Sequence, residues 1–290
     1  MTEAIAAPCP VCRAQGAKPY APFEEFTWLR CSCGAIFKVV PKGPARVIGE
    51  GAFGESGYGQ RYRANNRRRI GKSVRQIRDA LEFVDPRART APARLLDVGC
   101  SLGYTLEAAR ELGLDPTGVD ISSVAVEHCR SLGFQAQVAG LDELPFPDRH
   151  FSVVVMKHVL EHTITPDVAL REAKRVLREG GALFIAVPHA GYRKAVRNPS
   201  ASRFYRPDAH GGVEHWVYYT PETLGRLLKE QGFTVRSVHP LLVHPRQPGL
   251  ATSVEWLTAP LRAPVEALRS ALAIRKEFWI VATIQGLFTR

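Results

Sequence analysis

LLDVGCSLGY, residues 95–104, decides the fold of this 290-residue chain. The stretch begins as a short apolar strand and ends in a turn that contains Gly99 and Gly103, and helical spacing of apolar residues begins at Tyr104. Glycine lets the backbone approach a ligand where a Cβ would intrude. The stretch therefore predicts a strand, a ligand-binding turn and a helix in succession.

The next strand ends in Asp120, and this residue indicates the kind of ligand. A carboxylate at the carboxyl end of a strand can accept hydrogen bonds from both ribose hydroxyls of a nucleoside. A dinucleotide site would need the pattern G-x-G-x-x-G, but Ser101 and Tyr104 stand where its second and third glycines would lie. Asp97 would also repel a pyrophosphate, whereas it would attract the ammonium group of an amino acid. We therefore expect a ligand that combines adenosine with an amino acid.

Strands and helices alternate from Ala91 onward, which predicts an α/β domain with a parallel sheet covered on both faces. The predicted strands are Arg94–Gly99, Asp115–Asp120, Phe134–Val138, Phe151–Met156, Ala182–Pro188, Phe233–His239 and Phe278–Ile284, and the helices between them are Tyr104–Leu112, Val124–Leu132, Val168–Leu177 and Pro221–Gln231.

Four stretches resemble the successive motifs of the class I S-adenosylmethionine (SAM)-dependent methyltransferases, in the usual order and spacing. They are LLDVGCSLGY (95–104), TGVDIS (117–122), LPFPDRHFSVVVMKHVLEH (144–162) and RVLREGGALFIAVP (175–188). The resemblance covers about residues 91–239, and Phe278–Ile284 resembles the antiparallel strand that closes the sheet in this family. It implies a Rossmann-like seven-stranded sheet over residues 91–290, with SAM lying across the ends of the first two strands.

The family likeness also implies a cofactor-binding set. Asp97 and Gly99 would hold the methionine part of SAM, Asp120 the ribose, and Leu141 and Asp142 would border the adenine. The full set expected to bind SAM is Asp97, Gly99, Gly103, Asp120, Ile121, Leu141 and Asp142.

Four of the six cysteines lie in the first 33 residues, as the pairs Cys9/Cys12 and Cys31/Cys33. Such a cluster indicates a metal site before it indicates disulfides. The pattern resembles a zinc ribbon, although the second pair has one intervening residue where ribbons normally have two. We expect residues 1–45 to form a zinc-ribbon-like module with short strands at Phe26–Arg30 and Ala35–Val40. Because protein would fill all four coordination positions, the zinc would be structural; a metal-free relic of a ribbon is the alternative.

Residues 46–90 are expected to form a glycine-rich linker and then a basic helix. Apolar residues between Gly59 and Val84 recur at spacings of three and four. Residues 1–90 carry 16 Lys/Arg against 8 Asp/Glu, so they hold +8 of the chain's net charge of +11. The basic run could meet nucleic acid or a phosphorylated substrate, or it could be a solvated helix face.

Three histidines are candidate catalytic residues. His158 follows the fourth predicted strand, His189 follows the fifth, and His215 lies in the segment after the fifth strand. His158, Glu161 and His162 have i, i+3, i+4 spacing, which would place them on one helical face. They resemble the E-x-x-E-H motif of ubiquinone-pathway O-methyltransferases, in which a divalent metal lies near the acceptor, with His158 in place of the first glutamate. A structural role for Glu161 and His162 is the alternative.

Two insertions are expected within the domain. Residues 190–216, rich in His, Arg and aromatic side chains, are interpreted as a substrate lid, with an ordinary surface loop as the alternative. Residues 240–276 are interpreted as a helical insertion, whose apolar stripe in 250–274 would pack on the domain, mediate self-association or lie on a membrane surface.

Taken together, the motifs predict a SAM-dependent methyltransferase. The favoured reaction is O-methylation of a small-molecule or glycan acceptor. The basic side chains of residues 190–216 could hold an acceptor that carries a phosphate or a carboxylate. Methylation of an RNA base and a non-catalytic interaction role on the same fold stay open. The N-terminus lacks the features of a secretory signal and no apolar run reaches the length of a membrane span, so a cytoplasmic location is expected.

Overall fold

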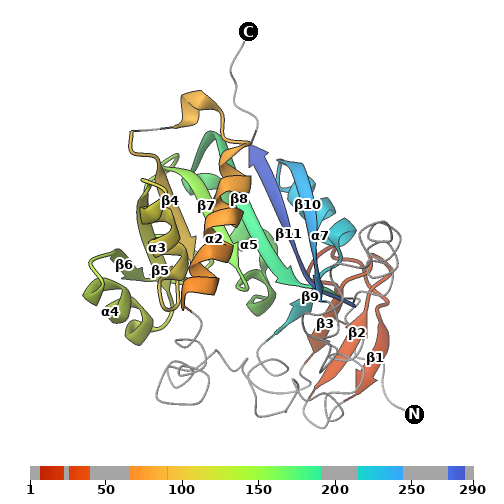
Figure 1. Ribbon diagram of the computed structural model, residues 1–290. Coiled ribbons are helices and arrows are strands. Elements are labelled where there is room, and N and C mark those ends of the chain that lie inside the picture. Colours follow the sequence, from red (N-terminus) through yellow and green to blue (C-terminus); the bar gives the residue numbers. More distant parts are fainter. Residues whose placement is uncertain are drawn as a thin grey trace, which may run out of the picture.

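The computed structural model describes residues 7–22, 26–39, 66–89, 91–190, 215–243 and 274–284 (Figure 1). A seven-stranded sheet is at its centre, with strand order β10-β11-β8-β7-β4-β5-β6. The strands are β4 (Arg94–Val98), β5 (Asp115–Asp120), β6 (Gln135–Val138), β7 (Phe151–Lys157), β8 (Leu177–Pro188), β10 (Phe233–Val243) and β11 (Ile274–Ile284). β4 to β8 pair in parallel, whereas β11 runs antiparallel to β8 and β10. The predicted Rossmann-like sheet with an antiparallel last strand is confirmed.

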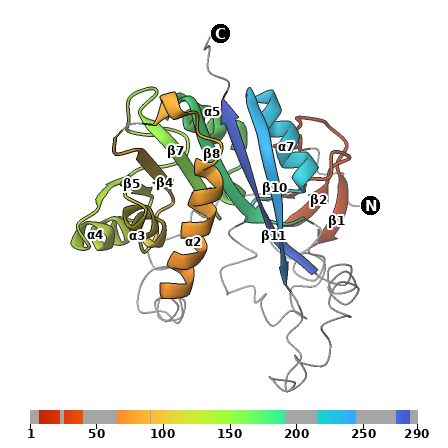
Figure 2. The same ribbon diagram turned by 45° about the horizontal axis from the view of Figure 1, so that its top comes forward.

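Helices cover both faces of this sheet because its central strands are apolar on both sides. In β7, Val153 and Val155 belong to one buried core, and Val154 and Met156 belong to another. Figure 2 shows the two layers. The first contains α2 (Asn66–Leu81), α3 (Tyr104–Glu111) and α4 (Ser123–Ser131), and the second contains α5 (Pro166–Val176) and α7 (Pro221–Glu230).

A second, four-stranded sheet is built from the N-terminal segment. Its order is β1 (Lys18–Pro22), β2 (Thr27–Arg30), β3 (Ile36–Val39) and β9 (Val217–Tyr218), all antiparallel. The two predicted ribbon strands correspond to β2 and β3, whereas the sequence pattern did not predict β1 or β9. β9 comes from the methyltransferase-like part of the chain, so the two parts share a sheet.

The last two strands are longer than the pattern predicts. β10 continues beyond His239 to Val243 and β11 begins at Ile274 rather than Phe278, because their backbones pair along this length. Both ends of the expected helical insertion (240–276) are therefore strand, and its residues 244–273 lie outside the described residues, as do residues 191–214 of the expected lid. Among the described helices, none combines the length and apolarity needed to cross a membrane.

Candidate functional site

A cavity of about 820 Å³ lies between α2 and the carboxyl end of β4, a size in the range of small-molecule sites. We call it the α2 cavity. Its lining residues are Arg68, Arg69, Lys72, Arg75, Gln76, Arg78, Asp79, Glu82, Asp97, Gly99, Cys100, Ser101, Tyr104, Thr105, Lys157, His158 and Trp279.

The backbone bend after β4 forms one wall of this cavity. Gly99 has φ +77°, and a Cβ at this position would overlap the side chain of Val159. The N–H groups of Gly99 and Cys100 both donate to the carbonyl oxygen of Val119, at 2.8 and 2.9 Å, so the bend is fixed to β5. Glycine at position 99 is therefore required both by its backbone conformation and by the close approach of the loop after β7.

Asp97 places a carboxyl group in the cavity with only 2% of its surface exposed. Burial raises the pKa of Asp97 to about 7, against the opposing effects of the Lys157 ammonium and a hydrogen bond from Thr105. A buried carboxyl group is stabilised in its charged form by a cation beside it. The site thus favours a ligand that brings a positive group to Asp97.

Asp120 lies at the end of β5 and holds the Gly99 loop in place. Its carboxylate accepts hydrogen bonds from the backbone N–H groups of Ser101, at 2.9 Å, and Ser122, at 3.0 Å. Burial raises the pKa of Asp120, and these two bonds oppose that shift. Each carboxylate oxygen has a further lone pair with which to accept a hydroxyl.

The other expected cofactor residues are not among those that line the α2 cavity. Gly103, with φ +78°, packs beside the thiol of Cys129, and a Cβ there would lie 3.3 Å from the sulfur. Ile121 is 44% exposed directly after Asp120. Leu141 is half-buried, and the carboxylate of Asp142 accepts a hydrogen bond from the Thr165 hydroxyl at 3.3 Å.

The contribution of α2 to the cavity could not be predicted from the motifs. The spacing of apolar residues predicted the basic helix, but it did not predict that this helix lines a pocket. Gln76 is 4% exposed, and neither polar atom of its amide has a hydrogen-bond partner among the described residues. Ser73 accepts a hydrogen bond from the Lys157 ammonium at 2.8 Å, which fastens α2 to the end of β7. One signal in the sequence could have indicated this role of α2: the polar residues Ser73 and Gln76 lie on the same face of the helix as the apolar Ile77.

A buried carboxylate surrounded by imidazoles follows β7. Glu161 is fully buried, and its two carboxylate oxygens lack a well-aligned hydrogen-bond donor among the described residues. Its Oε1 lies 3.5 Å from His158 Nδ1 and 3.9 Å from His215 Nε2. The His162 ring packs edge-on against that of His215, with centroids 4.8 Å apart. We call Glu161 and these three histidines the histidine cluster.

The histidine cluster does not form as the spacing predicted. Residues Leu160–His162 form a single turn of 3-10 helix, and His158 precedes it with φ +57°. His158, Glu161 and His162 therefore do not share a helical face, because the chain bends sharply between β7 and the turn. The three side chains still converge because Glu161 points into the core and the rings gather around it.

Charge in the cluster is balanced locally. Burial alone would raise the pKa of Glu161, but the hydrogen bond and charge of His158 and the charge of His162 outweigh it and lower the pKa. Burial lowers the pKa of His215 to about 3, so this ring is neutral near pH 7. Of the three candidate catalytic histidines, His158 lines the α2 cavity and is 37% exposed. His189 is not among the residues that line the α2 cavity; it forms a backbone bridge with Tyr219 and packs edge-on against Phe278.

The same cluster offers ligand atoms for a divalent cation. One carboxylate oxygen of Glu161 and ring nitrogens of His162 and His215 lie within 4.8 Å of one another. A mixed set of imidazole nitrogen and carboxylate oxygen suits transition metals such as zinc or iron. Together with the unsatisfied oxygens of Glu161, this donor set fits the metal that the E-x-x-E-H resemblance implies.

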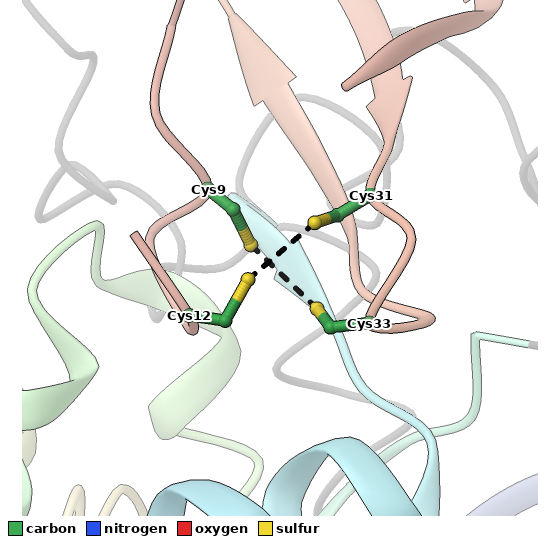
Figure 3. A group of neighbouring side chains, drawn as sticks. All are labelled: Cys9, Cys12, Cys31 and Cys33. Carbon is green, nitrogen blue, oxygen red and sulfur yellow. Dashed lines mark hydrogen bonds between the residues drawn. The ribbon is translucent and has the colours of Figure 1, made fainter. Parts of the chain in front are cut away.

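The four N-terminal cysteines converge on one point (Figure 3). The Sγ atoms of Cys9 and Cys33 are 3.8 Å apart, and those of Cys12 and Cys31 are 3.5 Å apart. Bonds of roughly 2.3 Å from zinc to four tetrahedral sulfurs would give edges of about 3.8 Å, so the set fits zinc. The shortened second pair reaches this geometry because its turn is closed by Gly34, with φ +97°, whose N–H donates to the Cys31 carbonyl at 3.0 Å.

Comparison with known proteins gives concordant matches. A family model described as a methyltransferase domain matches residues 62–238, more than half of the chain, with α2 included. A ubiquinone biosynthesis O-methyltransferase of Xanthomonas axonopodis pv. citri is 28% identical over 176 residues, covering 57% of this chain and 72% of that protein.

Two solved structures share the fold at lower sequence identity. One is a chain from the complex between the Haloferax volcanii Trm112 methyltransferase activator and a methyltransferase, with TM-score 0.56, 18% identity, and coverage of 84% of this chain and 100% of that chain. The other is a SAM-dependent methyltransferase from Archaeoglobus fulgidus, with TM-score 0.52, 20% identity, and coverage of 74% and 94%.

Proposed function

Since this chain belongs to the methyltransferase-domain family, whose model matches residues 62–238, we propose that it transfers the methyl group of SAM to an oxygen of a small-molecule or glycan acceptor. The observation that carries the proposal is the buried carboxyl of Asp97 beside the glycine bend. A carboxylate would repel a phosphate at this point and attract the ammonium of an amino-acid ligand.

The donor site is proposed to use two carboxylates and one glycine. Asp97 would hold the ammonium group, Asp120 would accept from the ribose hydroxyls, and Gly99 would let the methionine part lie against the backbone. The chemistry supplied by bound SAM is an electrophilic methyl group on a sulfonium. Positioning of acceptor and donor in line would then account for much of the rate.

His158 is the proposed general base for the acceptor hydroxyl. It lines the α2 cavity at the carboxyl end of β7, and its Nδ1 lies 3.5 Å from the buried Glu161 carboxylate. A carboxylate behind an imidazole orients the ring and stabilises its protonated form, so Nε2 would take the proton. If a divalent metal is bound by Glu161, His162 and His215, it would lower the pKa of an acceptor hydroxyl beside it.

An anionic acceptor is favoured by the charges of the α2 cavity. Five cationic side chains of α2 and Lys157 line it, against the carboxylates of Asp79, Glu82 and Asp97. The carboxylate of SAM would engage only part of this excess. The cationic face of α2 also keeps a second acceptor class, an RNA base, under consideration.

Donor binding is tested first. Calorimetry with the demethylated product of SAM should show binding that Asp97→Asn and Asp120→Asn each weaken by at least about tenfold, since each removes a charged hydrogen-bonding partner. Asp115→Asn, at the opposite end of β5, is the matched control and should bind as the unchanged chain does. Equal affinity in all four proteins would contradict the placement of the donor.

Acceptor class is tested with methyl-labelled SAM and fractionated host extract. We expect the label in small metabolites or glycans that an anion exchanger retains. Label in RNA, together with RNA binding that weakens steeply with salt, would replace the first acceptor class by the second.

A further inference from the structure

The N-terminal ribbon pairs its backbone with the rest of the molecule through β9, next to the histidine cluster. Figure 1 shows β9 beyond the carboxyl end of β8, between the large sheet and β3. The backbone of β9 pairs with β3 through Ile36↔Tyr218 and Phe37↔Val217. The N–H of Lys38 extends this seam by donating to the Trp216 carbonyl at 2.9 Å.

The same short segment carries the contacts to the histidine cluster. Trp216 N–H donates to the main-chain carbonyl of Glu161 at 2.7 Å, and His215 Nε2 lies 3.9 Å from the Glu161 carboxylate. The Tyr219 hydroxyl donates to the Leu160 carbonyl at 3.2 Å. Residues 215–219 therefore form hydrogen bonds with the ribbon through β3 and with the turn after β7.

Two side-chain contacts reinforce the junction between ribbon and domain, one from Lys38 of β3 and one from Thr223 of α7. Lys38 is only 6% exposed, and its ammonium lies over the Trp216 ring, 4.2 Å from the centroid. The Thr223 hydroxyl donates to the carbonyl of Cys33, one of the four clustered cysteines, at 2.8 Å. Direct contacts therefore connect the conformation of the cysteine cluster with the position of His215.

The proposed donor residues Asp97, Gly99 and Asp120 belong to other elements, at the ends of β4 and β5. No described residue of the ribbon or of 215–219 lines the α2 cavity, and His158 is the member of the histidine cluster that does. Release of the ribbon would therefore disturb the acceptor end and leave the donor end in place.

We propose that the metal-binding ribbon is a positioning element of the acceptor site: metal held by the four cysteines fixes β3, and the β3–β9 seam holds His215 against Glu161. Lys38 and Thr223 are the positioning residues. The assignment of this cluster to the acceptor rests on the proposed function, whereas the coupling between ribbon and cluster does not.

Hydrogen–deuterium exchange on the full chain, with bound zinc and after removal by a chelator, tests the coupling without a known acceptor. Amides of residues 215–219 and 160–162 should lose protection together with those of 27–39. Residues 95–120 should keep theirs, and the demethylated product of SAM should bind within about threefold of its original affinity. Protection at 215–219 that survives metal release would overturn the proposal, and so would a chain that binds no zinc. Loss of protection everywhere would also overturn it, because the two ends would then not be separable.

Substitutions that keep the metal provide the second arm. Lys38→Met retains the stem and removes the ammonium over Trp216. Thr223→Val removes the hydroxyl that bonds to the Cys33 carbonyl and, with it, the bond to the Thr220 hydroxyl. Each should lower the turnover of methyl transfer, by up to about 10²-fold for a misplaced site, with the KM for SAM unchanged and faster exchange at 215–219.

Arg13→Gln is the matched control, because Arg13 joins the ribbon to Asp167 of α5 and not to β9. It should leave turnover and exchange at 215–219 unchanged. An equal effect of Arg13→Gln would show that any contact between ribbon and domain matters, and would overturn a specific role for the seam. Failure of donor binding in the unchanged chain would instead count against the proposed function.

Discussion

Asp97 is the residue whose chemistry depends most directly on its surroundings. Its pKa of about 7 means that the carboxyl group is largely protonated below neutral pH and loses its attraction for an ammonium group. From about pH 7.5 to pH 6, affinity for the demethylated product of SAM should fall by about tenfold, the change in the ionised fraction of Asp97. Calorimetry at the two pH values measures this. Asp97→Asn should bind weakly at both, and an unchanged pH slope in that variant would assign the titration to another group.

Gly99 combines two requirements that substitution can separate. Alanine at position 99 would be strained by the positive φ of +77°, and its Cβ would also overlap the Val159 side chain. Gly113 has a similar φ of +73°, but no atom lies within 4 Å of the position that a Cβ would take. Gly113→Ala should cost about 1 kcal/mol of unfolding free energy, and Gly99→Ala clearly more. Denaturant unfolding gives both values. Val159→Ala added to Gly99→Ala should recover part of the loss; no recovery would mean that overlap with Val159 is not the cause.

His158 should matter for turnover and not for donor binding. Replacement by alanine removes the proposed base, so methyl transfer should fall by about 10²- to 10⁴-fold, while the demethylated product binds as before. His128→Ala on α4 is the control and should transfer at the original rate. Near-normal turnover of His158→Ala would leave His158 without a role in proton transfer.

Helix α2 carries the buried amide of Gln76, which has no hydrogen-bond partner among the described residues. Gln76→Leu removes two unpartnered polar atoms, so the ligand-free chain should gain about 1 kcal/mol of stability. If Gln76 meets the donor, the rise in melting temperature caused by the demethylated product of SAM should shrink in the same variant. Thermal unfolding with and without this ligand measures both effects. Gln137→Leu, on the exposed face of β6, is the control and should change neither the stability nor the ligand-induced rise in melting temperature. If Gln76→Leu is more stable but keeps the whole ligand-induced rise, the amide does not contact the donor, and its partner would be the acceptor.

Elements differ in how far the sequence could predict them. The large sheet was predictable because β4, β7 and β8 contain apolar runs and because β5 lies in a recognisable motif that ends at Asp120. The four cysteines were predictable as a cluster from their spacing. β9 was not, because a two-residue strand has no periodicity and pairs with a partner far away in the sequence. The approach of His215 to Glu161 was missed for the same reason. The strand character of Ile274–Glu277 was hidden by its charged side chains, since pairing with β10 is not visible in composition.

On the scale of the whole molecule, ribbon and domain should unfold together. Leu29 and Phe37 of the ribbon lie in one continuous buried core with Leu170 of α5 and Leu224 of α7. Calorimetric melting of the zinc-loaded chain should therefore show one transition, and its midpoint should fall when the metal is removed. Two resolved transitions, with only the smaller one sensitive to zinc, would contradict a shared core.

The pairing of β3 with β9 also constrains how the protein is made. Strands β1 to β3 are synthesised before β4 to β8, yet β9, which completes their sheet, is synthesised only after these. Until then the edge of β3 has no backbone partner in β9, and such an edge is open to pairing with other chains. Zinc bound early by the four cysteines would order the ribbon during this interval, so we expect zinc supply during translation to raise the yield of folded protein.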